Sequence, residues 1–188
     1  MTREARIEVL KTLLDGPRFG HCLRVERTAR QLAQQYGCDP EKAAVAGLVH
    51  DCAKQLKPGE RFRIAEQHHI PIDGIERRAP GLLHGAVGAV LAQERLEVRD
   101  PEILQAIRCH VTGATNMSTL DKVLYVADYV EPGRRFQGIA EVRGALKRGG
   151  LDACILAGLK LTIEDLMHRN LLLHPRSVEA YNAFVGKG

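Results

Sequence analysis

The chain has 188 residues, of which 45% are hydrophobic and 27% are charged, and its formal net charge is +4. This length favours one domain with a real hydrophobic core, and so small a charge gives no support for a nucleic-acid-binding protein, which usually carries a concentrated basic face. Aromatic residues make up only 4% and tryptophan is absent, so Leu, Val, Ile and Ala must build most of the core.

The cysteines and the N-terminus indicate the compartment. The five cysteines are odd in number and form no CxxC pair, which argues against a disulfide framework and a thiolate zinc site and favours a reducing compartment. The N-terminus, MTREARIEVLKTLL, is charged from Arg3 onward and has no apolar leader. No apolar stretch approaches the ~20 residues of a membrane span. The sequence therefore predicts a cytoplasmic protein.

Apolar residues recur at helical spacing along nearly the whole chain. They mark a first helix from Ile7 to Leu14 and a second from Leu23 to Tyr36, which Gly37 ends. The sequence Asp39-Pro40-Glu41 then combines an N-cap, a proline suited to the first helical position and an acidic residue at the positive end of the dipole. The third helix begins there and is predicted to run to about Lys54.

Later helices follow short connections. The same Asp-Pro-Glu signal returns at residues 100–102 and opens a helix to about His110. Ser118 and Thr119 can cap a helix through Val130, which Pro132-Gly133 ends. Further helices are predicted over residues 59–69, 81–95, 152–169 and 175–185. Because no segment alternates over the length of a strand, the sequence predicts one all-α domain over residues 1–188.

Histidine and aspartate residues interrupt or close several of these apolar helical faces. His50-Asp51 ends the run AVAGLVHDCAK, and Asp128 lies within LDKVLYVADYV. Buried ionisable groups are costly unless they are paired or bind a metal. A structural explanation of His50 is also open, because a histidine at the C-terminal end of a helix lies near the negative end of its dipole.

Four histidines and two aspartates are separated widely enough to lie on different helices, as an interior site of a helical bundle requires. Together they could hold two divalent metal ions with one carboxylate bridging, and no sulfur ligand is needed. Imidazole and carboxylate suit iron, manganese, zinc and other first-row ions. The candidate ligands are His21, His50, Asp51, His84, His110 and Asp128.

This order, His … His-Asp … His … His … Asp, resembles the HD superfamily of metal-dependent phosphohydrolases and, within it, the symmetrical diadenosine tetraphosphate hydrolases. The most specific likeness is the stretch LDKVLYVADYVEPGRR following AIRCH. The resembling stretches cover nearly the whole chain: RFGHCLRVERTARQLA, LVHDCAK, HGAVGA, AIRCHVTG, LDKVLYVADYVEPGRR and HPRSVEAYNAF.

The resemblance implies a single HD domain, a helical bundle with an interior dinuclear metal site. Its metal-binding core would span about residues 18–135, with the C-terminal helices 152–185 packed on that core. The six candidate ligands would bind two divalent ions, with iron expected and manganese or another first-row metal as alternatives. Asp51 would bridge them, because beside His50 it can offer one oxygen to each ion. The implied reaction is cleavage of diadenosine tetraphosphate into two ADP.

Charge considerations extend this interpretation to the substrate. Two close cations lower the pKa of a shared water from 15.7 toward ~7, so that a metal-bound hydroxide can attack the phosphoryl group. The four-phosphate bridge needs further cations beside the metals. The candidates follow, or share a helix face with, the ligands: Arg18, Lys54, Arg134 and Arg135. Asp51 and Lys54 are the expected catalytic residues.

Other polar residues have weaker assignments. Glu131 could orient an arginine that contacts the substrate or support a ligand histidine. Val111 stands where the family pattern has a hydroxyl residue, so Thr112, which follows it, becomes the candidate for that phosphate contact. Three residues match the family pattern without a role that can be derived: Lys122, His174 and Asn182.

Two alternative functions stay open. An HD-type nucleotide phosphatase or cyclic nucleotide phosphodiesterase would use the same centre, because the fold does not choose among these substrates. A non-catalytic RNA- or ribosome-associated helical protein is disfavoured by the few aromatic residues and the lack of a dense basic run. The expected partner is a dinucleoside polyphosphate or nucleotide substrate, with no membrane and no nucleic acid. A homodimer is left open.

Overall fold

The computed structural model describes residues 1–186, and every regular element in that range is a helix, which confirms the predicted all-α fold. Ten α-helices and one short 3-10 helix, η1, follow one another along the chain. In chain order they are α1 (Arg3–Leu13), α2 (Gly16–Tyr36), α3 (Pro40–Val49), α4 (Pro58–Gln67), α5 (Gly74–Arg78), η1 (Pro80–Leu83), α6 (His84–Arg95), α7 (Pro101–Cys109), α8 (Thr119–Val130), α9 (Ile139–His168) and α10 (Pro175–Val185).

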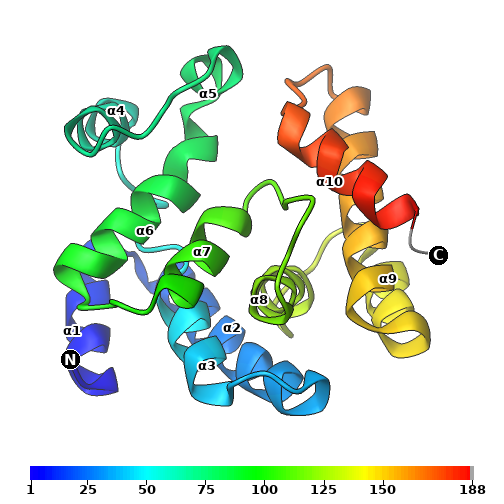
Figure 1. The fold of residues 1–188 in the computed structure, drawn as a ribbon, viewed down its shortest axis with the longest axis horizontal. Helices are drawn as coiled ribbons and strands as arrows, with labels where there is room; N and C mark the ends of the chain where they lie inside the picture. The colour runs from blue at the N-terminus through cyan, green and yellow to red at the C-terminus, as the bar shows by residue number, and fades with distance from the viewer. Residues whose placement is uncertain (187–188) are drawn as a thin grey trace.

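Helix α8 lies at the centre of the molecule (Figure 1). Helices α2, α3, α7 and α9 all pack against it, and α10 packs on α9. Most of α8 is apolar, and Leu124, Val126 and Ala127 are completely buried. A helix that is apolar on most of its surface has to be surrounded by other elements. Helix α8 therefore joins the N-terminal and C-terminal helices in one core, and its last turn carries Asp128.

The three helix starts predicted from capping residues are confirmed because the capping signals are local. The side chain of Asp39 accepts the backbone N–H groups of Glu41 and Lys42 at the start of α3. Asp100 caps α7 in the same way, and Ser118 accepts a backbone N–H at the start of α8. These side chains satisfy amide groups that have no partner within the helix.

The predicted end of the third helix at about Lys54 is wrong, because α3 ends at Val49. The Nδ1 atom of His50 lies 2.8 Å from the carbonyl oxygen of Gly47, which the N–H of Asp51 would bond in a continued helix. A turn follows instead, in which the N–H of Lys54 donates to the carbonyl of Asp51 at 2.8 Å. The side chain of His50 thus occupies the carbonyl oxygen of Gly47, to which the next residue would have to bond if the helix continued.

The helix predicted over residues 81–95 also begins differently. Pro80–Leu83 forms η1, and α6 starts only at His84. The carbonyl of Gly81 accepts the backbone N–H of His84, a bond between residues three apart that is typical of a 3-10 helix.

The long helix predicted over residues 152–169 is the second half of α9. This helix kinks at Gly150, whose backbone has φ 72° and ψ −159°, so the predicted start at residue 152 lies just after the kink. The first half of α9 and the five-residue helix α5 are absent from the sequence prediction. Both lie in segments rich in glycine or charge, whose apolar spacing is too weak to indicate a helix.

The single-domain prediction over residues 1–188 stays a prediction, and residues 187–188 lie outside the described part of the chain. Between residues 1 and 186, no helix combines the length and apolar character needed to cross a membrane.

Gly47 provides a test of how α2 and α3 approach one another. A Cβ atom at this position would lie 2.9 Å from the backbone of Glu26 on α2, which cannot move without shifting the helix. Gly47→Ala should therefore lower the free energy of unfolding by about 1–3 kcal/mol, measured by urea denaturation. Gly59→Ala is the matched control, because its Cβ would meet open space on α4 and alanine favours a helix. Equal stabilities of the two variants would contradict the close helix approach.

Candidate metal centre

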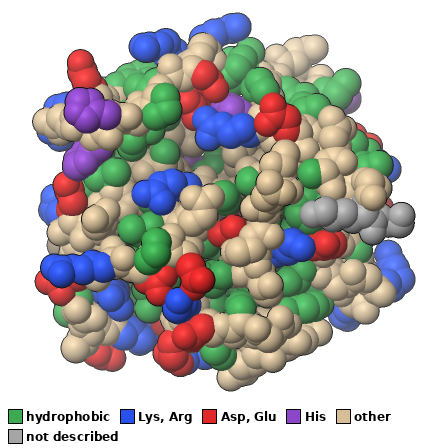
Figure 2. Space-filling view, viewed as in Figure 1, with side chains coloured by type: hydrophobic (Ala, Val, Ile, Leu, Met, Phe, Trp, Pro, Cys, Tyr) green, Lys and Arg blue, Asp and Glu red, His purple; other side chains and the backbone are tan. Residues whose placement is uncertain are grey.

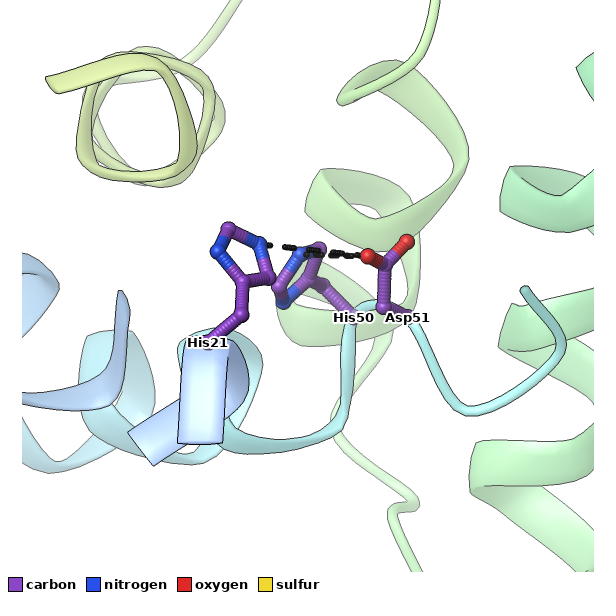
Figure 3. Close-up of side chains that lie close together, drawn as sticks. All are labelled: His21, His50 and Asp51. Carbon is purple, nitrogen blue, oxygen red and sulfur yellow. Dashed lines mark ion pairs between the residues drawn. The ribbon is translucent and has the colours of Figure 1, made fainter. Parts of the chain in front are cut away.

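The structure brings all six predicted ligand residues together around Asp51. His21 lies on α2, and His50 and Asp51 follow the end of α3, where Figure 3 shows the two imidazoles and the carboxylate facing one another. His84 is the first residue of α6, His110 follows the end of α7, and Asp128 lies in the last turn of α8. The four histidines and Asp51 are buried.

The two oxygens of Asp51 face two different pairs of histidines. Its Oδ2 atom lies 3.9 Å from His21 Nε2 and 3.5 Å from His50 Nε2. Its Oδ1 atom lies 3.3 Å from His84 Nε2 and 3.6 Å from His110 Nε2. The carboxylate is therefore shared between two neighbouring groups of possible ligand atoms.

Asp128 completes the side of the cluster that contains His21 and His50. Its Oδ1 atom lies 3.0 Å from His21 Nε2 and 3.8 Å from His50 Nε2. Arg134 donates to the same carboxylate from the loop after α8. The apolar sequence around Asp128 indicates that its carboxylate needs positive charge, and Arg134 supplies part of it.

Three of the histidines hold their Nδ1 atoms against a backbone carbonyl three residues earlier. The distances are 2.8 Å for His50, 2.6 Å for His84 and 2.7 Å for His110. His21 Nδ1 lies 3.1 Å from the carboxylate of Glu131. Since all four partners are oxygen acceptors, each Nδ1 carries the ring proton, and each Nε2 presents its lone pair to Asp51.

These inward-facing atoms fit cations. His21 Nε2, His50 Nε2 and Asp51 Oδ1 are buried and form no hydrogen bond with any described residue. His84 Nε2 and His110 Nε2, both acceptors in this tautomer, lie only 3.1 Å apart. Buried acceptors without donors are unfavourable, whereas imidazole and carboxylate around a cation, with the other ring nitrogen held by an oxygen, are typical of a metal site. The donor set therefore fits divalent metal ions.

The ionisation of the cluster agrees with this fit. Burial would raise the pKa of Asp51, but the imidazoles of His50, His110 and His84 hold it well below its ordinary value. Burial lowers the pKa of His84 to about 4, so this ring is neutral near pH 7. Burial would also lower the pKa of His50, yet Asp51 and Asp128 raise it above its ordinary value. The carboxylates thus attract positive charge to the centre.

Three of the four cationic residues predicted to contact phosphate reach the cluster. Arg18 Nη1 lies 2.9 Å from Asp51 Oδ2, and Arg134 donates to both the carboxylate and the backbone carbonyl of Asp128. Lys54 Nζ lies 3.2 Å from His84 Nε2, and burial lowers the pKa of this lysine. These cations line the same centre as the candidate ligands.

Two predicted substrate contacts lie elsewhere. Arg135 is exposed and donates to the backbone carbonyls of Pro132 and Arg134 rather than to the cluster. The hydroxyl of Thr112 donates to the carbonyl of Gly113, and its side chain lines a second cavity of about 560 Å³ that contains no residue of the metal centre. The structure therefore gives no support for a phosphate contact from either residue.

Glu131 contacts the candidate ligand His21, the contact that one of its two predicted roles requires. Burial would raise its pKa, but hydrogen bonds from Arg24, His21 and the N–H of Gly133 hold the pKa below its ordinary value. Arg24 Nε lies 2.6 Å from Glu131 Oε2. Arg24 is absent from the residues predicted from the sequence, although its spacing of three residues from His21 places both on one face of α2.

A cavity of about 940 Å³ opens from the centre, and Lys54, His84, His110, Asp128 and Arg134 line its inner end. Tyr125, Tyr129 and Phe136 form an aromatic wall, and residues from both halves of α9 and from neighbouring segments line the rest. These aromatic residues are absent from the residues predicted from the sequence. Their positions beside the Asp128–Arg134 stretch, in a chain so poor in aromatics, are the signal that could have found them.

Lys122 and His174, whose roles the sequence leaves open, make contacts away from the centre. Lys122 Nζ lies 2.7 Å from Asp152 and 5.6 Å from the centre of the Phe184 ring, which links α8 to the C-terminal helices. His174 caps α10, because its Nδ1 accepts the backbone N–H of Arg176. Asn182 is exposed on α10.

His174 also belongs to a second cluster with Asp73 and Glu76. Its Nδ1 is an acceptor in the α10 cap, and its Nε2 lies 3.0 Å from Oδ2 of Asp73, the residue that caps α5. Because its Nδ1 already bonds the backbone of α10, His174 links the starts of α5 and α10.

Comparisons with known proteins agree with this centre. Residues 18–133, a range that contains all six clustered residues, match the family model of the HD domain. The chain is 37% identical over 185 residues to the symmetrical bis(5'-nucleosyl)-tetraphosphatase of Bacillus subtilis (strain 168), with 98% of each protein covered. It is 35% identical over 182 residues to the protein of the same name from Halalkalibacterium halodurans, covering 97% of this chain and 96% of that relative.

A solved structure has the same fold. The crystal structure of a predicted HD superfamily hydrolase involved in NAD metabolism from Clostridium acetobutylicum superposes with a TM-score of 0.96 at 36% sequence identity. The match covers 100% of this chain and 99% of that chain.

Glu131 tests whether the support of His21 matters for metal binding. Glu131→Gln removes the charge that fixes the Nδ1 proton of His21, so we expect the affinity for Mn²⁺ to fall by about 10–100-fold, measured by isothermal titration calorimetry. Glu141→Gln on α9 is the control, because Glu141 is exposed and lies in the cavity wall. An unchanged affinity of the Glu131 variant would show that this carboxylate does not support the centre.

Proposed function

The chain belongs to the HD-domain family, and within that family we propose that it hydrolyses diadenosine tetraphosphate symmetrically to two molecules of ADP. Two relatives that match it over nearly their full length carry the name of this activity. The observation that carries the proposal is the convergence of four imidazole Nε2 atoms on the two oxygens of one buried carboxylate, Asp51. This arrangement suits a two-metal hydrolytic centre.

The centre would hold two divalent ions, and the pairing of its atoms suggests how they divide. Three groups of possible ligand atoms overlap here, and two of them share Asp51. One ion would be held by Asp51 Oδ2 with His21, His50 and Asp128, and the other by Asp51 Oδ1 with His84 and His110. Nitrogen and oxygen donors without sulfur suit iron, which we expect, and also manganese or another first-row metal.

Two such metal ions, when bound, supply Lewis-acid activation of water and of a phosphoryl oxygen. The protein's part is to place the substrate. Attack at either of the two inner phosphorus atoms breaks the central P–O bond and forms a new P–O bond from water, so that both products are ADP. The leaving group is a terminal phosphate with a pKa near ~6, so it departs as an anion without a protein acid.

Lys54, Arg134 and Arg18 would bind the phosphate chain. Lys54 and Arg134 line the inner end of the large cavity, next to His84 and Asp128. A guanidinium group can form two parallel hydrogen bonds with a phosphate, and both arginines are partly exposed toward solvent. The lysine adds a charge close to the atoms that react, which offsets the negative charge of the transition state.

Among the alternatives, an RNA-associated role has the least support. Figure 2 shows positive and negative side chains interspersed over the visible face rather than gathered by sign. A nucleotide phosphatase or cyclic nucleotide phosphodiesterase would use the same ligands, so the products of the reaction have to distinguish them. The cytoplasmic location stays a prediction, and homodimer formation stays open.

Product analysis tests the proposed reaction. Protein loaded with Fe²⁺ or Mn²⁺ should convert diadenosine tetraphosphate to ADP alone, because cleavage of the central bridge divides the molecule into two identical halves, and chromatography of the quenched reaction measures this. Treatment with a chelator should abolish turnover. Equal amounts of AMP and ATP would rule out symmetrical cleavage, and release of inorganic phosphate from a mononucleotide alone would favour the phosphatase alternative.

Elemental analysis tests the metal site independently of activity. Freshly purified protein should contain about two metal ions per chain, as a two-metal site requires. Asp51→Ala should reduce this content sharply, because its carboxylate is shared by both groups of ligands. Asp152→Ala, which removes a carboxylate that pairs with Lys122 far from the centre, should keep the wild-type content. Unchanged metal in the Asp51 variant would refute the assignment.

A further inference from the structure

The large cavity changes character from its inner to its outer end. Its inner end holds the histidine cluster with Lys54 and Arg134, so it suits phosphate groups. Its outer end mixes both signs, because Glu164 and Asp165 line it together with Arg169, which pairs with Asp165, so it offers no gathered positive charge to phosphate. A nucleotide would therefore enter with its phosphates inward and its nucleoside against the wall between these ends.

That wall is aromatic, in a chain that contains little aromatic material. The sequence has four Tyr, four Phe and no Trp, and three of these eight residues, Tyr125, Tyr129 and Phe136, line this one cavity. Phe136 is 37% exposed, whereas large apolar side chains are usually buried. An exposed ring on a cavity wall is available for contact with a ligand.

The ring of Phe136 rests on a rigid support. It packs edge-to-face on Tyr129, with ring centres 5.5 Å apart, and Tyr129 in turn stacks on the buried Tyr125. The hydroxyl of Tyr129 lies 3.0 Å from both the carbonyl of Gly158 and the hydroxyl of Thr162. Tyr129 is therefore fixed at both ends, and it fixes the position of Phe136.

The loop that carries Phe136 is also tied down. Arg134, two residues earlier, bonds to Asp128, and the N–H of Ile139 donates to the carbonyl of Phe136. Gly138 has φ 89°, and a Cβ atom there would lie 2.9 Å from Leu161 on α9, so the loop packs closely on that helix. Two residues span at most about 7 Å, so Arg134 and Phe136 lie within reach of one nucleotide.

We propose that Phe136, supported by Tyr129, is the wall on which a purine base of the substrate stacks, while Arg134 holds the adjoining phosphate. This subsite rests on the proposed hydrolysis of dinucleoside tetraphosphates and adds its nucleoside-binding element. Base–aromatic contact depends on the π-face that every base has, so the subsite contributes affinity with weak discrimination among bases. The phosphate-binding end of the cavity does not depend on it.

The absence of tryptophan from the sequence permits a direct binding test. Phe136→Trp places a single fluorophore on the proposed wall, so addition of ADP should quench its emission by stacking, while inorganic pyrophosphate should not. Met167→Trp is the control, because Met167 is 65% exposed on α9 and is not part of the cavity wall, and ADP should leave its emission unchanged. The proposal would be overturned if the emission of the Phe136→Trp protein did not change on addition of ADP, or if it changed equally on addition of pyrophosphate.

Affinities give a second readout. Phe136→Ala should raise the Kd for ADP about 10-fold, in the range that loss of one stacked base produces, and leave the Kd for pyrophosphate unchanged. Phe136→Tyr, which keeps the ring, should bind ADP as the wild type does. Equal weakening of both ligands, or of neither, refutes the subsite even if the enzyme releases ADP from diadenosine tetraphosphate. Selective loss of ADP binding supports it even if that reaction is not observed.

Discussion

The centre depends on the tautomer of its four histidines, that is, on which of the two ring nitrogens carries the proton. Each histidine holds its Nδ1 proton against a fixed oxygen, so each Nε2 lone pair faces Asp51. A ring with the other tautomer would place an N–H in the centre and would repel a cation. The partners of the four rings are therefore as important to the site as the rings themselves, because they decide which nitrogen can act as a ligand.

The fold supplies these partners at the ends of helices. The carbonyl oxygens in the last turn of a helix accept no hydrogen bond within the helix, so a side chain can donate one to them. His50 and His110 each take such a carbonyl at the ends of α3 and α7, and His84 takes one from η1. His21 lies inside α2 and needs another partner, which Glu131 provides from the end of α8. The same contacts thus end the helices and orient the ligands.

The sequence predicts those features that depend on neighbouring residues or on a motif. Helix starts are found because capping by Asp39, Asp100 or Ser118 is local, and the six clustered residues are found because a histidine or aspartate in an apolar face is costly without a partner. The end of α3 is not found, because it depends on whether His50 turns back to Gly47. Arg24 is missed for a similar reason, since its partner Glu131 lies 107 residues away in the sequence.

For the histidines at the ends of helices, the structural explanation and the functional explanation coincide. The negative end of the helix dipole favours positive charge, and α3 and α7 both direct that end toward the cluster. Each of the three carboxylates of the centre also has its own arginine: Arg18 on Asp51, Arg134 on Asp128 and Arg24 on Glu131. Arg24 pairs with a carboxylate that orients His21, so the positive charge of Arg24 is needed to hold that carboxylate in place. Arg18 and Arg134 bind carboxylates that cations would neutralise, which leaves these two guanidinium groups free to turn to a phosphate.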